Sequence, residues 1–261
     1  MQTGNRIVKS VSERNQLYKG LIMQLTGPEI LRRMQIKNKN NPDAKPDIII
    51  KPFNEKCLGS NSYDLHLGNL LKIYRKTLPR GMNPIIPYCP GKMYSMRDWF
   101  NNYDSYLDFI ARPWEFDIRN PQYILDPCDT ASHETIDIEI PKNGGILSPM
   151  IGYLGHTVEY TETYNLFPYI DGKSSVGRNF ILNHHTAGRG DDGFCGQWTL
   201  EIRTLYPTVV YPNMRIAQIY YEEFTGERKP YNQNTTSHYN GQMGPTPAAI
   251  IPIENIKQKQ R

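Results

Sequence analysis

The residues best suited to chemistry lie close together in the sequence, within residues 171–203. This stretch combines serines, a lysine, arginines, two adjacent histidines, an acidic pair and a glutamate with two apolar runs typical of strands. Glycines separate these groups. A glycine lets the backbone approach a ligand closely, while strands hold side chains in fixed positions. The stretch therefore predicts a binding site on a β scaffold.

The segment GKSSVGR carries three kinds of phosphate donor on a predicted turn. They are the Lys173 ammonium, the hydroxyls of Ser174 and Ser175, and the Arg178 guanidinium. The Walker pattern is absent, so this is not a P-loop. A plain polar surface turn would use the same residue types, and the local sequence leaves both interpretations open.

Carboxylates and histidines follow the turn. Glu201 lies in a predicted strand between two apolar residues that point to the opposite face. It is either solvated or held in a pocket where burial raises its pKa for proton transfer. Asp191 and Asp192 lie in a glycine-rich loop. Their carboxylates could bind a sugar hydroxyl, bind a metal through phosphate, or simply favour the turn. His184 and His185 are expected to face opposite ways in a strand, with a structural role for at least one.

Composition limits the classes of protein that fit. The chain has 261 residues, a net charge of +4 and a mean hydropathy of −0.60, as expected of a globular protein. No apolar run approaches the roughly 18 residues that span a bilayer, and the N-terminus lacks the apolar core of a secretory signal, so we expect a cytoplasmic protein. The basic residues are too few and too dispersed for nucleic acid binding. Four cysteines without a CxxC pair predict free thiols.

The first part of the chain predicts one helix and two strands. A capping-box spacing from Thr26 to Glu29 starts a helix of about ten residues. Residues 47–53 form an apolar run typical of a buried strand. In residues 60–75 apolar and polar side chains alternate, which predicts a strand with one buried face. Asp64 falls on the other face, either as a solvated aspartate or as a functional one.

The regular pattern breaks over about residues 78–132, which we expect to be an insertion between strands, with a short helix at residues 95–111. Such insertions serve packing, oligomer contacts or a lid. Alternating isoleucines around a Lys-Asn-Gly-Gly turn predict a hairpin over residues 134–159. Further strands are expected at residues 167–172, 180–186 and 196–203, and residues 208–224 are expected to contain a turn at Pro212 and Asn213 and a final long strand, followed by a flexible tail. Many short strands and one N-terminal helix predict a mostly β, barrel-like domain.

Six motifs then connect the chain to a known family. They are SYDLHLG (62–68), HTVEY (156–160), KSSVGR (173–178), HHTA (184–187), DDGFCG (191–196) and TLE (199–201). With these motifs in this order, the chain resembles the dCTP deaminase and dUTPase family, and more closely its dCTP deaminase branch. The resemblance covers roughly residues 25–74 and 137–243.

The resemblance implies a fold and an assembly. The fold would be a dUTPase-like distorted β-barrel, or β-clip, over residues 23–224, with residues 1–22 as an N-terminal extension and residues 225–261 as a tail that closes over the site. The assembly would be a homotrimer with sites at subunit interfaces. Magnesium would arrive on the nucleotide triphosphate rather than in a cage of protein ligands. Zinc is not expected, because the H-x-E and P-C-x-x-C motifs of zinc deaminases are absent.

The resemblance also implies residue roles. Glu201 would be the general acid/base, Ser174 and Arg178 would position the water and the base, and the backbone of Ala187 would help to hold the water. Asp191 matches the contact to the deoxyribose 3′-hydroxyl. The nucleotide-binding set implied in this way is Lys173, Ser175, Val176, Gly177, Asp191, Thr199, Leu200, Tyr231, His238 and Gln242.

Several departures accompany this match, among them Gly190 and Asp192, which replace an apolar residue and often a proline in the acidic loop. Lys173 stands where the family usually has arginine, and His238 stands where its tail usually has lysine. Gly188 is more like the members that both deaminate dCTP and hydrolyse the resulting dUTP.

The main prediction is hydrolytic deamination of dCTP to dUTP and ammonia. One alternative is a related enzyme, either a bifunctional one that continues to dUMP or a dUTPase alone. Another is a non-catalytic trimeric module, structural or regulatory, whose insertion carries the contacts. The presence of Glu201, Ser174 and Arg178 together argues against the module.

Overall fold

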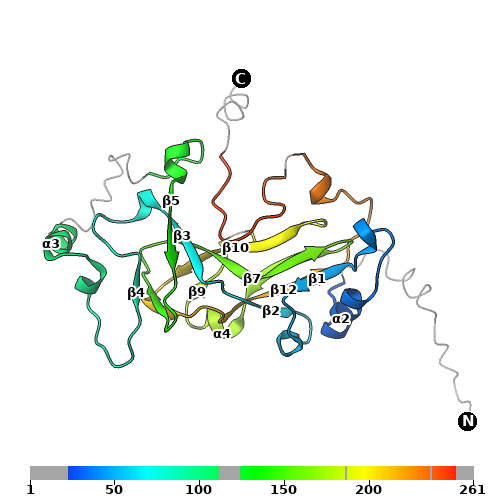
Figure 1. Ribbon diagram of the computed structural model, residues 1–261, viewed down its shortest axis with the longest axis horizontal. Helices are drawn as coiled ribbons and strands as arrows, with labels where there is room; N and C mark the ends of the chain where they lie inside the picture. Colours follow the sequence, from blue (N-terminus) through cyan, green and yellow to red (C-terminus); the bar gives the residue numbers. More distant parts are fainter. Residues whose placement is uncertain (1–22, 112–123, 186, 236, 251–261) are drawn as a thin grey trace, which may run out of the picture.

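The computed structural model describes residues 23–111, 124–185, 187–235 and 237–250. Most of its regular structure is strand, arranged in three sheets, with the helices at the margins (Figure 1). The predicted mostly β domain with a short N-terminal helix is confirmed. The predicted N-terminal extension, residues 1–22, and the end of the tail, residues 251–261, lie outside the described residues. No helix within the described ranges is long and apolar enough to cross a membrane.

The largest sheet is organised around β7 (Tyr153–Thr163), which pairs antiparallel with three strands. These are β10 (Cys195–Thr204), β3 (Leu70–Tyr74) and β1 (Ile48–Lys51), while β5 (Thr135–Glu139) pairs with β3 and β9 (Ile181–Leu182) with β10. Along β10, buried and half-buried residues alternate strictly up to Ile202. Leu200 and Ile202 therefore face the core, and Glu201 faces the opposite side.

Two smaller sheets complete the β structure. One has the order β11 (Thr208–Val210), β6 (Gly145–Leu147), β4 (Ile85–Pro87), and the other β2 (Tyr63–His66), β12 (Arg215–Glu222), β8 (Phe167–Gly172). Their apolar side chains and those of the large sheet share one core. Its fully buried members include Leu65, Leu71, Leu147, Ile202, Ile216 and Ile219.

The helices are short. They are α2 (Gly27–Gln35), α3 (Tyr103–Ala111) and the single turn α4 (Ser174–Gly177), with 3-10 turns η1 (Pro42–Ala44), η2 (Glu55–Cys57), η3 (Arg75–Thr77), η4 (Met96–Trp99), η6 (Thr130–His133) and η7 (Tyr231–Gln233). The predicted capping box of α2 does not form. Thr26 makes no side-chain cap, and the Glu29 side chain pairs with Arg32 and Arg33 rather than with the backbone of Thr26. The predicted helix at residues 95–111 is η4 followed by α3.

The predicted hairpin over residues 134–159 is wrong. The turn forms, with Gly144 N–H bonded to the Pro141 carbonyl, but β5 pairs with β3, and β6 pairs with β4 and β11. On β3, Ile73 lies opposite Ile136 and Leu71 opposite Ile138, so the apolar side chains of β5 pack against those of β3. Alternation identified the strands, but it carries no information about which strand each one pairs with.

Two further strand predictions need correction. Residues 60–75 form two strands, and both faces of β2 are covered, so that Asp64 is buried rather than solvated. Of residues 180–186 only Ile181–Leu182 form a strand. His184 and His185 lie beyond it, and the argument that they face opposite ways in a strand does not apply. Residues 78–132 connect the neighbouring strands β3 and β5, and their strand β4 joins the second sheet.

Candidate active site

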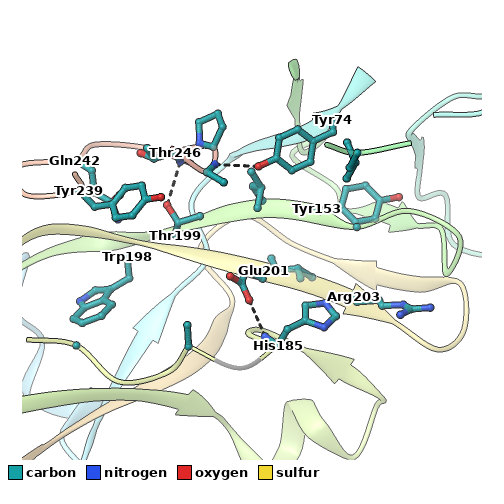
Figure 2. A pocket seen from close by; sticks show the side chains of 18 of the residues that line it. Tyr74, Tyr153, His185, Trp198, Thr199, Glu201, Arg203, Tyr239, Gln242 and Thr246 are labelled. Atoms are coloured by element: carbon teal, nitrogen blue, oxygen red, sulfur yellow. Dashed lines mark hydrogen bonds between the residues drawn. The ribbon is translucent and has the colours of Figure 1, made fainter. Parts of the chain in front are cut away.

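A cavity of about 790 Å³ lies along β10, between the loop before this strand and the C-terminal tail. Figure 2 shows Thr199 and Glu201 projecting into it, with Gln242 and Thr246 of the tail on one side and His185 on the other. Thr199 and Glu201 share a face of the strand because they are two residues apart. The same alternation that buries Leu200 in the core therefore places these polar groups in the cavity.

Glu201 is held through one of its two carboxylate oxygens. Its Oε2 accepts a hydrogen bond of 2.8 Å from the backbone N–H of His185. Its Oε1 has no protein partner among the described residues. A carboxylate fixed at one oxygen and open at the other can take a proton from a water molecule in the cavity and return it to a ligand.

The loop before β10 divides the predicted acidic pair. Asp191 lines the cavity, whereas Asp192 is buried and accepts two hydrogen bonds from the Arg228 guanidinium, at 2.8 and 3.0 Å. Two glycines shape this loop. Gly193 has a φ of +88°, and a Cβ on Gly190 would come within 2.2 Å of the Trp198 ring. Asp192 therefore anchors the base of the tail, and Asp191 alone is available to a ligand.

The tail lies along the free edge of β10, as an added strand would. Gln197 N–H bonds the Gln242 carbonyl at 3.0 Å, and the Gln242 side chain bonds the Gln197 carbonyl at 2.7 Å. Further along, Thr246 N–H bonds Thr199 Oγ1 at 3.1 Å, and the Tyr74 hydroxyl accepts the next contact, from a tail backbone N–H at 3.0 Å. The described part of the tail has little regular structure, and these bonds place it over the cavity (Figure 2).

The predicted site residues fall into two groups. Those that line the cavity are Glu201, Ala187, Asp191, Thr199, Tyr231 and Gln242. Those on or beside α4 do not line it: Lys173, Ser174, Ser175, Val176, Gly177 and Arg178. Two residues belong to neither group, because Leu200 is buried in the core and His238 is exposed on the tail. In Figure 1, α4 lies below the large sheet and the tail leaves above it.

The α4 group has its own electrostatic centre at Asp64. Both oxygens of this carboxylate contact the Lys173 ammonium, at 2.9 and 2.8 Å. Burial alone would raise the pKa of Asp64, but hydrogen bonds from Lys173 and Gln218 outweigh burial and hold the pKa below its ordinary value. Asp64 is thus an ionised, buried partner of the lysine that the sequence assigns to phosphate binding.

Several cavity residues escaped the sequence prediction. Arg203 lines the cavity two residues after Glu201, so the alternation of β10 contained the signal that could have found it. Tyr74, Leu125 and Tyr153 come from distant segments, and Leu125 belongs to the insertion. The positions of Tyr74 and Tyr153 depend on the pairing of β3 with β7, which no local sequence pattern indicates. Within the described ranges, no group of three or more His, Cys, Asp or Glu side chains is arranged to hold a metal ion.

Comparison with known proteins agrees with the sequence resemblance. Residues 110–224 match the family model described as dCTP deaminase-like. The protein named dCTP deaminase, dUMP-forming, from Cytophaga hutchinsonii is 34% identical over 212 residues, which cover 81% of this chain and 92% of that protein. A protein of the same name from Hathewaya histolytica is 34% identical over 222 residues, or 85% of this chain and 97% of that protein.

Among solved structures, the 2′-deoxycytidine 5′-triphosphate deaminase from Agrobacterium tumefaciens matches with a TM-score of 0.46 and 16% sequence identity. That match covers 78% of this chain and 48% of that chain. The sequence relatives are matched at higher identity and over nearly their whole lengths. This chain therefore belongs to the dCTP deaminase family.

Proposed function

We propose that this protein deaminates dCTP hydrolytically and then cleaves the triphosphate, so that its products are dUMP, ammonia and pyrophosphate. The observation that carries the proposal is Glu201, open at one oxygen in a cavity closed by the tail, in a chain of the dCTP deaminase family. The relatives are named as dUMP-forming, which favours the bifunctional alternative over the main sequence prediction of dUTP release.

In the deamination step, Glu201 accepts a proton from a water molecule whose oxygen bonds to C4 of the cytosine ring. The backbone of Ala187 helps to hold that water. Glu201 then returns this proton to N3 of the ring and carries the proton of the new C4 hydroxyl to the amino nitrogen. The bond between C4 and that nitrogen breaks, the C4 carbonyl forms, and ammonia leaves. Ser174 and Arg178 stabilise the charge that develops on the base.

In the second step, a second water attacks the α-phosphorus, the bond to the bridging oxygen breaks, and pyrophosphate leaves. Magnesium carried by the triphosphate would neutralise charge on this leaving group. Asp191 would bind the 3′-hydroxyl of the sugar. The remaining nucleotide contacts proposed from the family pattern are Lys173, Ser175, Val176, Gly177, Thr199, Leu200, Tyr231, His238 and Gln242.

The separation of the two groups supports a homotrimer in which α4 of one subunit completes the cavity of another. Beside α4, four large apolar side chains are exposed: Phe180, Leu182, Leu205 and Tyr206. Phe180 and Tyr206 stack edge to face at 5.4 Å, so together they form a continuous apolar surface. A second copy of the chain would cover this surface and bring Ser174 and Arg178 to its neighbour's Glu201.

The test is an incubation with dCTP and magnesium that resolves dUMP, dUTP, ammonia and pyrophosphate over time, with Glu201→Gln as the control. We expect one ammonia and one pyrophosphate per dUMP, and no product from the variant. Accumulation of dUTP without pyrophosphate would show a deaminase alone. No product from a folded trimer would refute the proposal and favour the non-catalytic module.

A further inference from the structure

Arg215 and Asp64 lie beside the predicted phosphate-binding segment, although the sequence pattern gave neither a role in the reaction. Asp64 is on β2, and Arg215 is the first residue of β12, which pairs with β2. Besides Lys173, Asp64 accepts hydrogen bonds from Arg215 Nη1 at 3.2 Å and from Gln218 Nε2 at 3.1 Å. Lys173 and Arg215 contact the same oxygen, Oδ2, so the two cations are close neighbours.

The two cations differ in how many donors they have left for a ligand. A lysine ammonium has three N–H donors. The ammonium of Lys173 already donates to both carboxylate oxygens of Asp64. An arginine side chain has five N–H donors, and that of Arg215 makes one hydrogen bond to a protein group within the described ranges. The Arg215 side chain is 48% exposed, against 26% for Lys173. A guanidinium also matches phosphate in a bidentate geometry, which an ammonium does not.

We propose that Arg215 is a phosphate-binding residue of the nucleotide site and that Asp64 is the positioning residue that holds Arg215 and Lys173 side by side. This inference rests on the proposed function. Asp64 suits the task because its side chain is only 9% exposed and Gln218 fixes its carboxylate. Holding both cations before the ligand arrives reduces the entropy lost on binding. Arg215 thus supplies the bidentate grip that Lys173 lacks.

The competing interpretation is a purely structural cluster that ties β2, β12 and the start of α4 together. It predicts that variants of Arg215 and Asp64 lower the melting temperature and leave phosphate affinity unchanged. A phosphate-binding role predicts a loss of affinity for any ligand that carries the triphosphate, with or without a base. Inorganic tripolyphosphate is the probe that isolates this part of the site.

The experiment measures binding of tripolyphosphate and of dCTP by calorimetry, using the full chain. The variants are Arg215→Gln, Arg215→Lys and Asp64→Asn, with Arg32→Gln and Asp137→Asn as controls from ion pairs elsewhere on the surface. We expect Arg215→Gln to weaken both ligands by about tenfold or more, because a hydrogen bond to a charged group is lost. Arg215→Lys should recover part of the loss, and the controls should bind as the wild type does.

Steady-state kinetics provide a second readout. Arg215→Gln should raise KM for dCTP by the same factor and leave kcat within about twofold, because the contact is equal in ground and transition states. Asp64→Asn should act in the same way, and Arg215→Gln decides the question if Asp64→Asn does not fold. The inference is overturned if the wild type does not bind tripolyphosphate, or if Arg215→Gln leaves both its affinity and KM unchanged.

The same data separate this inference from the proposed function. Arg215-dependent binding of tripolyphosphate by a protein that forms no product would refute the reaction and support the phosphate site. If the wild type forms its products normally and Arg215→Gln changes neither tripolyphosphate affinity nor KM, the reaction is supported and the phosphate site is refuted.

Discussion

The cavity and the α4 region differ in how they hold their functional groups. In the cavity, main-chain donors and the tail fix polar side chains on a strand face, and Glu201 is the central group. At α4, the serines and Arg178 are exposed, and Lys173 is fixed by a buried carboxylate. The cavity offers a carboxylate that can accept a proton, and the α4 region offers donors suited to anionic charge. The proposed reaction needs both, yet a single chain does not bring them together.

The largest effect should come from the cavity. Glu201→Gln keeps the size of the side chain and removes its ability to accept a proton, so we expect kcat to fall about 1,000-fold or more. Release of ammonia from dCTP measures the effect, with the exposed Glu139→Gln on β5 as the matched control. A Glu201→Gln enzyme of near-normal kcat would show that the cavity does not carry the chemistry.

The next effect tests whether the two regions meet across subunits. Glu201→Gln and Arg178→Gln chains should each be inactive, but mixed subunits should regain activity. In a trimer with random exchange, about one quarter of the interfaces pair an intact Glu201 with an intact Arg178. We therefore expect about a quarter of wild-type activity after unfolding and refolding the two chains together. If mixed trimers form but regain no activity, Glu201 and Arg178 must act within one chain.

A smaller effect should come from the docking of the tail. The Gln197 side chain accepts a hydrogen bond of 2.6 Å from Gly244 N–H, although Gln197 itself does not line the cavity. Gln197→Ala should raise KM for dCTP about threefold to tenfold, since one hydrogen bond that closes the tail is lost. The exposed Gln233→Ala on the same tail serves as control. An equal change in both variants would mean that the loss is not specific to the docking contact.

The smallest effect concerns stability and compares two buried aspartates. Burial raises the pKa of Asp47, but hydrogen bonds from Asn38, Asn165 and other groups, including Arg33, outweigh it and lower the pKa. This carboxylate therefore stabilises the fold above its unfolded pKa of 3.8, and the contribution is lost as pH falls through the lower folded value. Asp47→Asn should cost about 1 kcal/mol at pH 7, and the difference from wild type should shrink between pH 4 and pH 2.

Urea unfolding at several pH values measures this difference. Asp64, whose pKa is also lowered, provides the comparison. Asp64→Asn should show the same loss of stability and also weaker binding of tripolyphosphate, whereas Asp47→Asn should bind as the wild type does. Equal phosphate affinities in the two variants would remove the functional distinction between these aspartates.

The sequence by itself determined the local features of the site. The two-residue period of β10 predicted that Glu201 and Leu200 face opposite sides, and both do. The motif order identified the family, which the relatives confirm. These features depend on residues close together in the chain, so they can be predicted without knowing the fold.

The tertiary structure decided everything that depends on distant partners. It paired β5 with β3 instead of β6, buried Asp64 against Lys173 and Arg215, and laid the tail along the free edge of β10. It also placed α4 away from the cavity. A strand with alternating apolar residues can pack against any partner strand that offers a matching apolar face. A charged side chain can likewise pair with any opposite charge within reach. The choice among such partners is made by the packing of the whole chain.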